Sequence, residues 1–222
     1  MNIKLLVVGG TTLALVAAFL LAAERYRNQK AEEMSFLAQE NARLFVPEYA
    51  PTMGNEKASV FIVEFLDPEC EACRAFYPSV KKIMKDYEKD LQLVVRYAPF
   101  HKNSMNAVRV LEASRKQNKY WETMEILFAT QPQWAAHHNP QPERIWEIVP
   151  KVGINVEQAK ADMMDPEISA RIQQDIKDGE ILGVRRTPTF FVNGTPLQRF
   201  SYDDLVALVE SEIEKAKGLQ KH

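Results

Sequence analysis

Hydrophobic residues form one long stretch near the amino terminus, from Leu5 to Ala23. About nineteen residues without a charge are enough for a helix that spans a bilayer. A cleaved signal peptide normally has a shorter apolar region and ends in a small-x-small site, which the sequence around Ala23 matches poorly. We therefore expect residues 1–23 to be a retained signal anchor, with residues 5–23 forming a transmembrane helix.

A polar segment with a partial helical stripe follows at residues 24–50, and we interpret it as a stalk. Two interpretations of its apolar face stay open: it packs on its own domain, or it joins copies of the chain into a homo-oligomer. The stripe covers too few heptads to predict a coiled coil. Pro47, Pro51 and Gly54 mark the boundary with the globular part, which we place at residues 51–222.

The globular part begins with a β-α-β pattern. Ser59–Leu66 and Leu91–Tyr97 are apolar nearly throughout and rich in β-branched and aromatic residues, which is typical of strands buried on both faces. Between them, apolar residues recur at helical spacing from Cys73 onward. Near the carboxyl end, Thr189–Val192 and about Thr195–Phe200 flank an Asn-Gly pair and predict a hairpin.

Composition narrows the classes of function. Hydrophobic residues make up 46% of the chain, which is ample for a packed core, and the formal net charge is -2. A nucleic-acid-binding protein normally has a clear excess of cations, so nucleic acid is not expected as a partner. The sequence has no phosphate-binding glycine loop and no dinucleotide fingerprint.

The chain has two cysteines, Cys70 and Cys73, at the turn between the first strand and its helix. A disulfide between them closes so short a loop that it restrains the unfolded chain little, which favours a redox pair over a structural bridge. Cys70 falls at the helix N-terminus, where unpaired N–H groups and the helix dipole stabilise a thiolate. We predict Cys70 as the attacking thiol and Cys73, one turn on, as the resolving thiol.

Glu64 is a charged residue inside the first buried strand, six residues before Cys70. A buried, unpaired carboxylate is costly, so its pKa should rise. We predict that Glu64 takes and returns the proton of Cys73 during exchange. The alternative is that strand alternation turns Glu64 outward to a solvated edge.

With these motifs, the chain resembles the DsbA-like thiol-disulfide oxidoreductases of the thioredoxin superfamily over about residues 55–217. The matching residues are Phe65–Cys73 with its C-x-x-C, Glu64 at the buried-acid position, Thr187-Pro188 at the cis-proline position, and the strand and turn Thr189–Gly194. The resemblance implies a cis Thr187–Pro188 bond that faces the cysteines, where the backbone of Thr187 pairs with an extended substrate strand. An ordinary trans proline that opens the strand is the alternative.

The resemblance also implies an α/β thioredoxin fold with a helical insertion, here at about residues 100–181. The sequence agrees with this expectation, because the region contains several helical stretches and no convincing strand. The candidate helices are Lys102–Asn118, Tyr120–Ala129, Pro142–Val149, Val156–Met164 and Pro166–Asp178.

The dipeptide between the cysteines, Glu71-Ala72, departs from the family pattern, since strong oxidants of the family typically carry a histidine there. Glu71, together with Asp67 and Glu69, adds negative charge that opposes thiolate formation. Arg74 offsets this charge only in part. We therefore predict a pair that is less oxidising than the strong oxidants of the family.

The residues and the resemblance together predict a protein thiol-disulfide oxidoreductase with no cofactor and no metal. Its expected partners are cysteine-containing substrate proteins and a redox partner that recycles the cysteine pair, and oxidase, isomerase and reductase activities all stay open. Two other classes also stay open. One is a copper- or zinc-handling thiol protein, with His137 and His138 as further candidate ligands, and the other is a chaperone or binding module on the same scaffold.

The sequence carries conflicting signals on localisation. Arg25, Arg27 and Lys30 follow the apolar stretch, and the positive-inside rule taken alone places the domain in the cytoplasm. The redox pair and the resemblance favour the opposite side. We expect a single-pass protein of the bacterial inner membrane whose catalytic domain faces the periplasm or the outside.

Overall fold

A mixed β-sheet lies at the centre of the globular part. The computed structural model describes residues 3–40, 44–136 and 138–219, and within them the sheet has five strands in the spatial order β1-β3-β2-β4-β5. The strands are β1 (Thr52–Gly54), β2 (Val60–Leu66), β3 (Leu91–Tyr97), β4 (Thr189–Val192) and β5 (Thr195–Pro196). β2 runs parallel to β3 and antiparallel to β4, so the strand that leads to the cysteines has a partner on each side.

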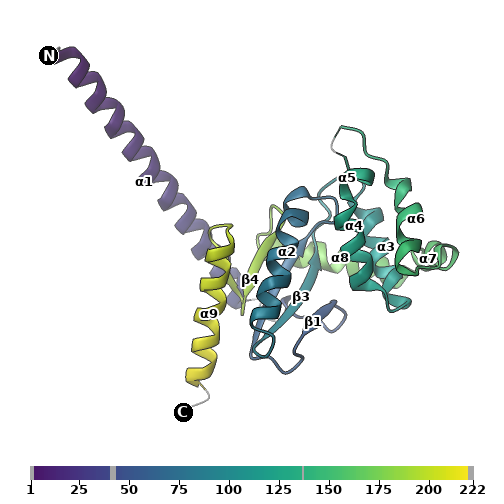
Figure 1. The fold of residues 1–222 in the computed structure, drawn as a ribbon. Coiled ribbons are helices and arrows are strands. Elements are labelled where there is room, and N and C mark those ends of the chain that lie inside the picture. Colours follow the sequence, from purple (N-terminus) through teal and green to yellow (C-terminus); the bar gives the residue numbers. More distant parts are fainter. Residues whose placement is uncertain (1–2, 41–43, 137, 220–222) are drawn as a thin grey trace.

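Helices cover both faces of this sheet. α2 (Glu71–Asp86) and α9 (Tyr202–Leu219) supply apolar residues to the cluster on one face (Figure 1). α8 (Pro166–Ile181) packs against β3 on the other face, where Gly179 leaves room for the ring of Phe65. The expected α/β thioredoxin fold is therefore present, with α2 leaving directly from the end of the central strand.

Strand alternation divides β2 between the two faces, because successive side chains of a strand point in opposite directions. Ile62 and Leu66 belong to the cluster that includes α2. Val63 and Phe65 belong to a second cluster, which also contains Phe45. β2 is thus buried on both faces, as its continuous run of apolar residues predicts.

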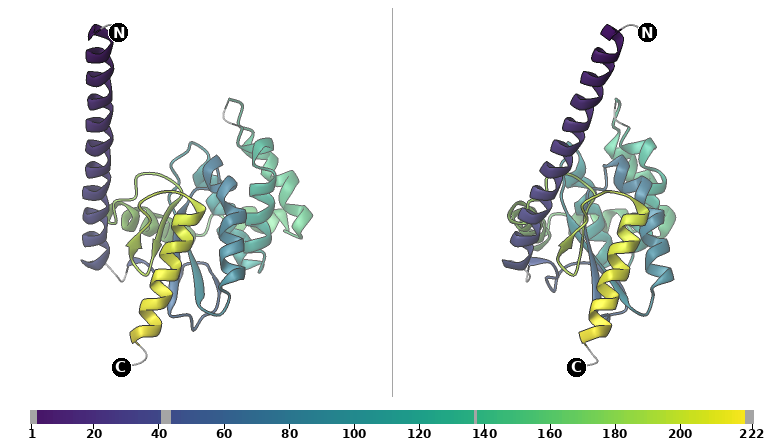
Figure 2. Two further views of the ribbon diagram at one scale, coloured as in Figure 1. Left: turned by 60° about the vertical axis from the view of Figure 1, so that its left-hand side comes forward. Right: turned by 90° about the vertical axis from the view of Figure 1, so that its left-hand side faces the viewer.

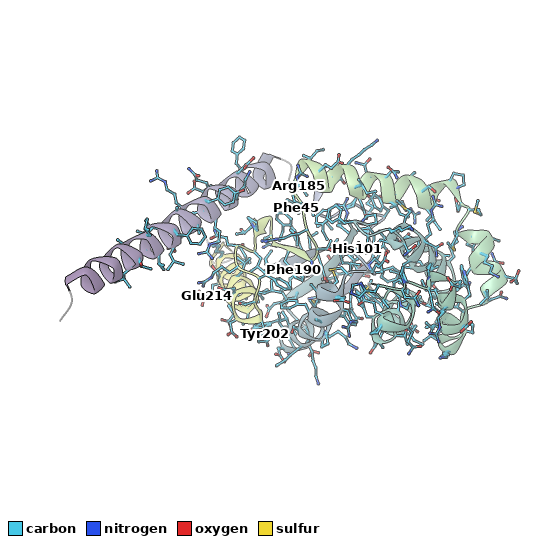
Figure 3. The ribbon with its side chains drawn as sticks, turned by 90° about the horizontal axis from the view of Figure 1, so that it is seen from above. Phe45, His101, Arg185, Phe190, Tyr202 and Glu214 are labelled. Atoms are coloured by element: carbon cyan, nitrogen blue, oxygen red, sulfur yellow. The ribbon has the colours of Figure 1, made fainter. Side chains whose placement is uncertain are left out.

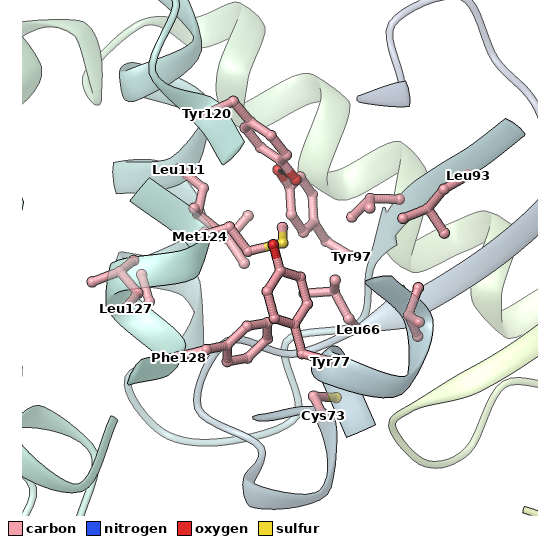
Figure 4. Packing of buried hydrophobic residues seen from close by; sticks show 14 of the residues in the cluster. Leu66, Cys73, Tyr77, Leu93, Tyr97, Leu111, Tyr120, Met124, Leu127 and Phe128 are labelled. Carbon is pink, nitrogen blue, oxygen red and sulfur yellow. Dashed lines mark hydrogen bonds between the residues drawn. The ribbon is translucent and has the colours of Figure 1, made fainter. Parts of the chain in front are cut away.

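The predicted helical insertion follows β3. Its elements are α3 (Ser104–Lys116), α4 (Tyr120–Ala129), α5 (Gln131–Trp134), η2 (Pro142–Arg144), α6 (Ile145–Ile148), η3 (Val149–Val152) and α7 (Val156–Asp162), and α8 returns the chain to the sheet. The insertion packs on the sheet through an apolar cluster that Figure 4 shows, where the hydroxyl groups of Tyr97 and Tyr120 lie 2.8 Å apart. The segment predicted as a helix over Pro142–Val149 is helical throughout, but it is divided into one α-helical and two 3₁₀ pieces. The α-helical piece ends before Pro150, which has no N–H to donate to the carbonyl of Trp146.

The amino-terminal segment is one helix, α1 (Ile3–Glu40), with no break between the predicted anchor and the predicted stalk. It projects away from the domain as a long rod, and its carboxyl-terminal half lies beside β5 (Figure 2). Among the described residues, no helix combines the length and the apolar character that crossing a membrane requires. Residues 41–43 of the stalk lie outside the described residues, and Phe45 and Ala50, which we had assigned to the stalk, are buried in the domain core.

Two details at the sheet edges differ from the prediction. The second hairpin strand ends at Pro196 and does not continue to Phe200, because proline cannot donate a ladder hydrogen bond and Leu197 makes the last one, to Phe190. The short edge strand β1 was not predicted. It ends at Gly54, whose φ of +99° and 2.7 Å approach of an added Cβ to the carbonyl oxygen of Leu91 both require glycine.

Candidate active site

Cys70 occupies the N-cap position of α2, at the point where β2 gives way to the helix. Its backbone has extended torsion angles (φ -73°, ψ 120°), and its carbonyl oxygen accepts the first helical hydrogen bond, from the N–H of Arg74 at 3.1 Å. Its side chain is 6% exposed. Cys70 and Cys73 are both free thiols in this structure.

The surroundings of Cys70 favour its thiolate. The hydrogen bond from the Cys73 thiol contributes most to lowering the pKa of Cys70, burial opposes it, and a hydrogen bond from the Thr187 side chain lowers it further. The backbone N–H groups of Ala72 and Cys73 at the start of α2 also stabilise the charge, and together these effects lower the pKa of Cys70 to about 5. Cys70 is therefore a thiolate at neutral pH, which is the form that attacks disulfides.

Cys73 has the opposite character. It is fully buried in the first turn of α2. Burial raises the pKa of Cys73 well above its ordinary value, and the hydrogen bond to Cys70 and the charge of Glu64 raise it further. The two sulfurs therefore differ strongly, with one ionised near the surface and one protonated beneath it.

Glu64 lies in the middle of β2, paired with Val95 of β3 and Phe190 of β4. It is 2% exposed, so the alternative of a solvated edge position is wrong. It alternates with Val63 and Phe65 and shares the strand face of Ile62 and Leu66, which lies on the α2 side of the sheet. Burial, followed by the charge of Cys70, raises the pKa of Glu64 to about 8, as the burial of an unpaired carboxyl group predicts.

The Thr187–Pro188 peptide bond is cis, as the resemblance implies. The carbonyl oxygen of Thr187 lies 3.4 Å from the sulfur of Cys70, which can donate its thiol proton to it. Residues far apart in the sequence, Cys70 and Thr187, therefore meet at one point on the surface. The structure brings together all five residues that the sequence analysis selected: Glu64, Cys70, Cys73, Thr187 and Pro188.

The acidic residues before Cys70 have hydrogen-bond partners that a count of charges along the sequence does not include. Asp67 is fully buried, and its carboxylate accepts hydrogen bonds from the backbone N–H groups of Phe100 and His101 at 2.8 and 3.1 Å. The same oxygen lies 2.7 Å from Nδ1 of His101. Burial lowers the pKa of His101, but the hydrogen bond and the charge of Asp67 outweigh it, so that the pKa is raised. The Asp67 carboxylate is therefore paired with donors of the loop after β3 and does not point its charge unpaired at Cys70.

Glu69 is held in the same way by the start of α3. Its carboxylate accepts hydrogen bonds from the backbone N–H of Asn103 at 2.8 Å and from the Asn103 side chain at 3.0 Å. The hydroxyl of Ser104 donates to Asp67. These contacts fasten the turn that carries Cys70 to the insertion. The sequence analysis selected neither His101 nor Ser104, because nothing near them in the chain indicates a contact with Asp67.

Gln131 is a further residue that the sequence analysis missed. It is buried in the insertion, and its side-chain amide donates to the carbonyl oxygens of Pro68 and Cys70 at 2.8 and 3.0 Å. Its side-chain oxygen accepts from Nε of Arg74 at 3.0 Å. The insertion thus holds both ends of the redox turn, and only the folded chain reveals this.

No group of three or more His, Cys, Asp or Glu side chains in the part of the chain that the structure describes is arranged to hold a metal ion. His137, one of the two histidines considered as ligands, lies outside the described residues. The arrangement around Cys70 is that of a thioredoxin-fold protein with a cysteine pair at the start of α2.

Comparisons with known proteins place the chain in a family. The thioredoxin family model matches residues 47–211, which is more than half of the chain, and the chain therefore belongs to the thioredoxin family. The crystal structure of a thioredoxin-like oxidoreductase from Silicibacter pomeroyi superposes with a TM-score of 0.67 at 27% identity, over 80% of this chain and 98% of that one. The thiol-disulfide exchange protein alpha-DsbA2 of Wolbachia pipientis shares the fold, with a TM-score of 0.66 at 20% identity over 84% of this chain and 97% of that one.

Curated relatives are of two kinds. A Na(+)/H(+) antiporter NhaA of Herminiimonas arsenicoxydans is 32% identical over 71% of this chain, but the match spans only 24% of the antiporter's length. A Rickettsia conorii protein named "Putative protein-disulfide oxidoreductase RC0029" is 26% identical over 90% of this chain and 72% of its own length. The fold, the cysteine pair and these relatives confirm the resemblance to DsbA-like thiol-disulfide oxidoreductases.

Proposed function

We propose that this protein exchanges disulfides with cysteine-containing proteins, using Cys70 as the attacking sulfur and Cys73 as the resolving one. The observation that carries the proposal is the difference between the two sulfurs. Cys70 is 6% exposed with a pKa of about 5, and Cys73 is fully buried with a raised pKa. Such a pair has one sulfur suited to attack and a second that stays protonated until a mixed disulfide forms.

In the oxidising direction, a substrate thiolate attacks the sulfur of Cys70 in the Cys70–Cys73 disulfide. The S–S bond of the pair breaks, Cys73 leaves as a thiolate, and it takes up a proton. A second substrate thiolate then attacks the substrate sulfur of the mixed disulfide, and Cys70 leaves as its stable thiolate. The substrate loses two electrons and the pair gains two; the reducing direction is the reverse sequence.

Glu64 is the proposed source and acceptor of the proton of Cys73. Its pKa of about 8 keeps it protonated near neutral pH, so it can donate a proton when Cys73 leaves as a thiolate. In the reducing direction the carboxylate takes that proton back and Cys73 becomes able to attack the mixed disulfide. The burial of Glu64 in β2 and the effect of its charge on the pKa of Cys73 support this role.

Thr187 and Pro188 form the proposed binding point for the substrate backbone. The carbonyl oxygen of Thr187 faces Cys70 at 3.4 Å, and an extended peptide whose cysteine lies at Cys70 can donate an N–H to it. A proline at the next position has no N–H of its own to compete for a partner. This contact recognises backbone, so it suits many substrate sequences.

The proposed location is outside the cytoplasm, where disulfides persist. A membrane-impermeant thiol reagent applied to intact cells should label reduced Cys70, and labelling only after lysis would contradict this placement. A redox partner that recycles the pair is also part of the proposal, and the direction of exchange follows from this redox partner.

Self-association through α1 is a further part of the proposal. Size measurements on the full chain test it.

Trapping tests the central proposal. Replacing Cys73 with Ala removes the resolving sulfur, so mixed disulfides at Cys70 should accumulate and can be released with a reductant and identified. Cys70→Ala is the matched control, and it should trap nothing. If the Cys73→Ala variant is folded but accumulates no mixed disulfides, the proposed exchange is wrong, and a metal-content assay on the reduced protein then tests the metal-handling alternative.

A further inference from the structure

A cavity of about 450 Å³ adjoins the cis-proline turn. Residues of α1 form one wall. Glu180 of α8 and residues between Gly183 and Phe200, including Pro188, form the rest. Resting on the proposed exchange function, we propose that this cavity binds an acidic stretch of the substrate protein next to its reactive cysteine. The cavity would thereby favour acidic substrates among the many whose backbone can pair with Thr187.

Four cationic side chains line the cavity: Arg27, Lys30, Arg185 and Arg186. Two carboxylates, Glu33 and Glu180, also line it, so four positive charges face two negative ones and the excess is two. Lys30 is paired with Glu33 at 2.6 Å. Within the described part of the chain, the three arginines have no carboxylate at ion-pair distance, so their charge is not neutralised by a partner. Arg185 donates one hydrogen bond, to the carbonyl oxygen of Val184 at 3.2 Å.

These charges come from segments far apart in the sequence. Arg27 and Lys30 belong to α1, whereas Arg185 and Arg186 precede the cis-proline turn. Figure 3 shows Arg185 and Phe190 on the side of the domain that α1 approaches. The hydrogen bond to Glu33 raises the pKa of Lys30, and the positive charge of Arg185 opposes that rise, as expected when two cations share one cavity. Like charges held together attract a ligand of opposite charge.

Apolar groups complete the cavity and strengthen this attraction. Phe190 is buried at its base, and Tyr26 and Phe200 are 62% and 47% exposed at its sides. Ring surfaces of this kind exclude water around a bound peptide and lower the local dielectric, so the arginines act more strongly on a carboxylate there than in open solvent. Salt should weaken the attraction because the charged groups remain near the surface.

The position of the cavity connects it to the chemistry. Thr187, whose carbonyl oxygen is 3.4 Å from the Cys70 sulfur, lies between Arg186 and the cavity residue Pro188. Residues of an extended peptide are about 3.3 Å apart. In the proposed complex, a substrate strand paired at Thr187 places residues that flank its cysteine within a few residues' length of Arg186 and the cavity.

Two peptide disulfides test this inference. The two peptides have identical residues next to the cysteines. Beyond these residues, one peptide carries glutamates and the other carries lysines. The reduced wild-type chain should reduce the acidic peptide about fivefold faster at low salt, in keeping with two or three exposed ion pairs, and the preference should vanish at high salt. An acidic peptide with serine in place of cysteine should bind directly, as measured by fluorescence anisotropy.

A matched pair of charge-removing variants completes the experiment. Arg27→Gln with Lys30→Gln should bring the ratio of the two rates close to one and weaken binding of the serine peptide. Lys89→Gln with Lys151→Gln removes the same charge from exposed sites that do not line the cavity, and should leave the preference intact. Equal rates for both peptides with the wild-type chain would overturn this inference alone, whereas no exchange with either peptide would overturn the proposed function as well.

Discussion

The hydrogen bond from Cys73 is the largest contribution to the low pKa of Cys70, and it can be removed without touching the other contributions. Cys73→Ala deletes the thiol that donates it. The backbone N–H groups of residues 72 and 73 and the contact with Thr187 remain, because none of them depends on the Cys73 side chain. The variant therefore isolates one cause of thiolate stabilisation.

The size of the effect follows from the energy of such a bond. A hydrogen bond to a charged group contributes about 1.5–3 kcal/mol, and each pKa unit corresponds to about 1.36 kcal/mol. The pKa of Cys70 should therefore rise from about 5 by roughly one to two units, to about 6–7. At pH 7 the thiolate fraction should fall from about 99% to between about 50% and 90%.

The assay is the ultraviolet absorbance of the thiolate measured against pH, checked by the pH dependence of alkylation. The reduced Cys70→Ala variant is the blank, since the raised pKa of Cys73 keeps that thiol protonated over this range. A Cys73→Ala titration that coincides with the wild-type curve would refute the assignment of the low pKa to the Cys73 hydrogen bond. A midpoint near the ordinary cysteine value would instead mean that the helix N-terminus contributes little.

Four further predictions concern stability and potential. The pKa of Cys70 is about 5 in the folded chain, below its ordinary value of 9.0. The thiolate should therefore stabilise the folded reduced form relative to the oxidised form by its full amount above pH 9.0, and this stabilisation should disappear as pH falls through about 5. Denaturant unfolding of both forms across this range measures it. Glu64→Gln should slow exchange about hundredfold, as an insulin-reduction assay measures. The stability of this variant relative to wild type should grow as pH rises from 4.5 through about 8, because the raised pKa of Glu64 makes ionisation of the wild-type carboxyl group destabilising. The same unfolding experiment measures this difference. Arg96→Met should lower the free energy of unfolding by about 3–5 kcal/mol, because it leaves Asp175 and Asp178 buried without the guanidinium that lies 2.7 and 2.6 Å from them. The reduction potential against glutathione should lie between about -270 and about -120 mV, the thioredoxin and DsbA values, since the pKa of Cys70 lies between theirs.

Much of the fold and the centre of the site could be predicted from local patterns. The continuous apolar runs of β2 and β3 identified two buried strands, and the change to helical spacing after Cys73 identified α2. These patterns are local because a strand buried on both faces and an amphipathic helix each record their surroundings in their own sequence. The position of the cysteines at a helix N-terminus followed directly.

The prediction that the pair is less oxidising than the strong oxidants of the family stays a prediction, but the tertiary structure changes the charge argument behind it. Asp67 and Glu69 lie three residues and one residue before Cys70, but their carboxylates make hydrogen bonds with His101 and Asn103 from the loop after β3. A charge count along the chain cannot include a partner about 34 residues away, because only the fold determines which donors reach a buried carboxylate.

The sequence by itself therefore determined the chemistry of the pair: two cysteines one helical turn apart, an acid in the strand before them, and a Thr-Pro turn. The tertiary structure alone decided their environment. It brought Thr187 to Cys70, fastened the redox turn with Asp67 and Gln131, and set Arg27 of α1 beside the cis-proline turn. The physical reason is that spacing along a helix or strand is set by local backbone geometry, whereas a cavity, an ion pair or a shifted pKa depends on groups that only packing brings together.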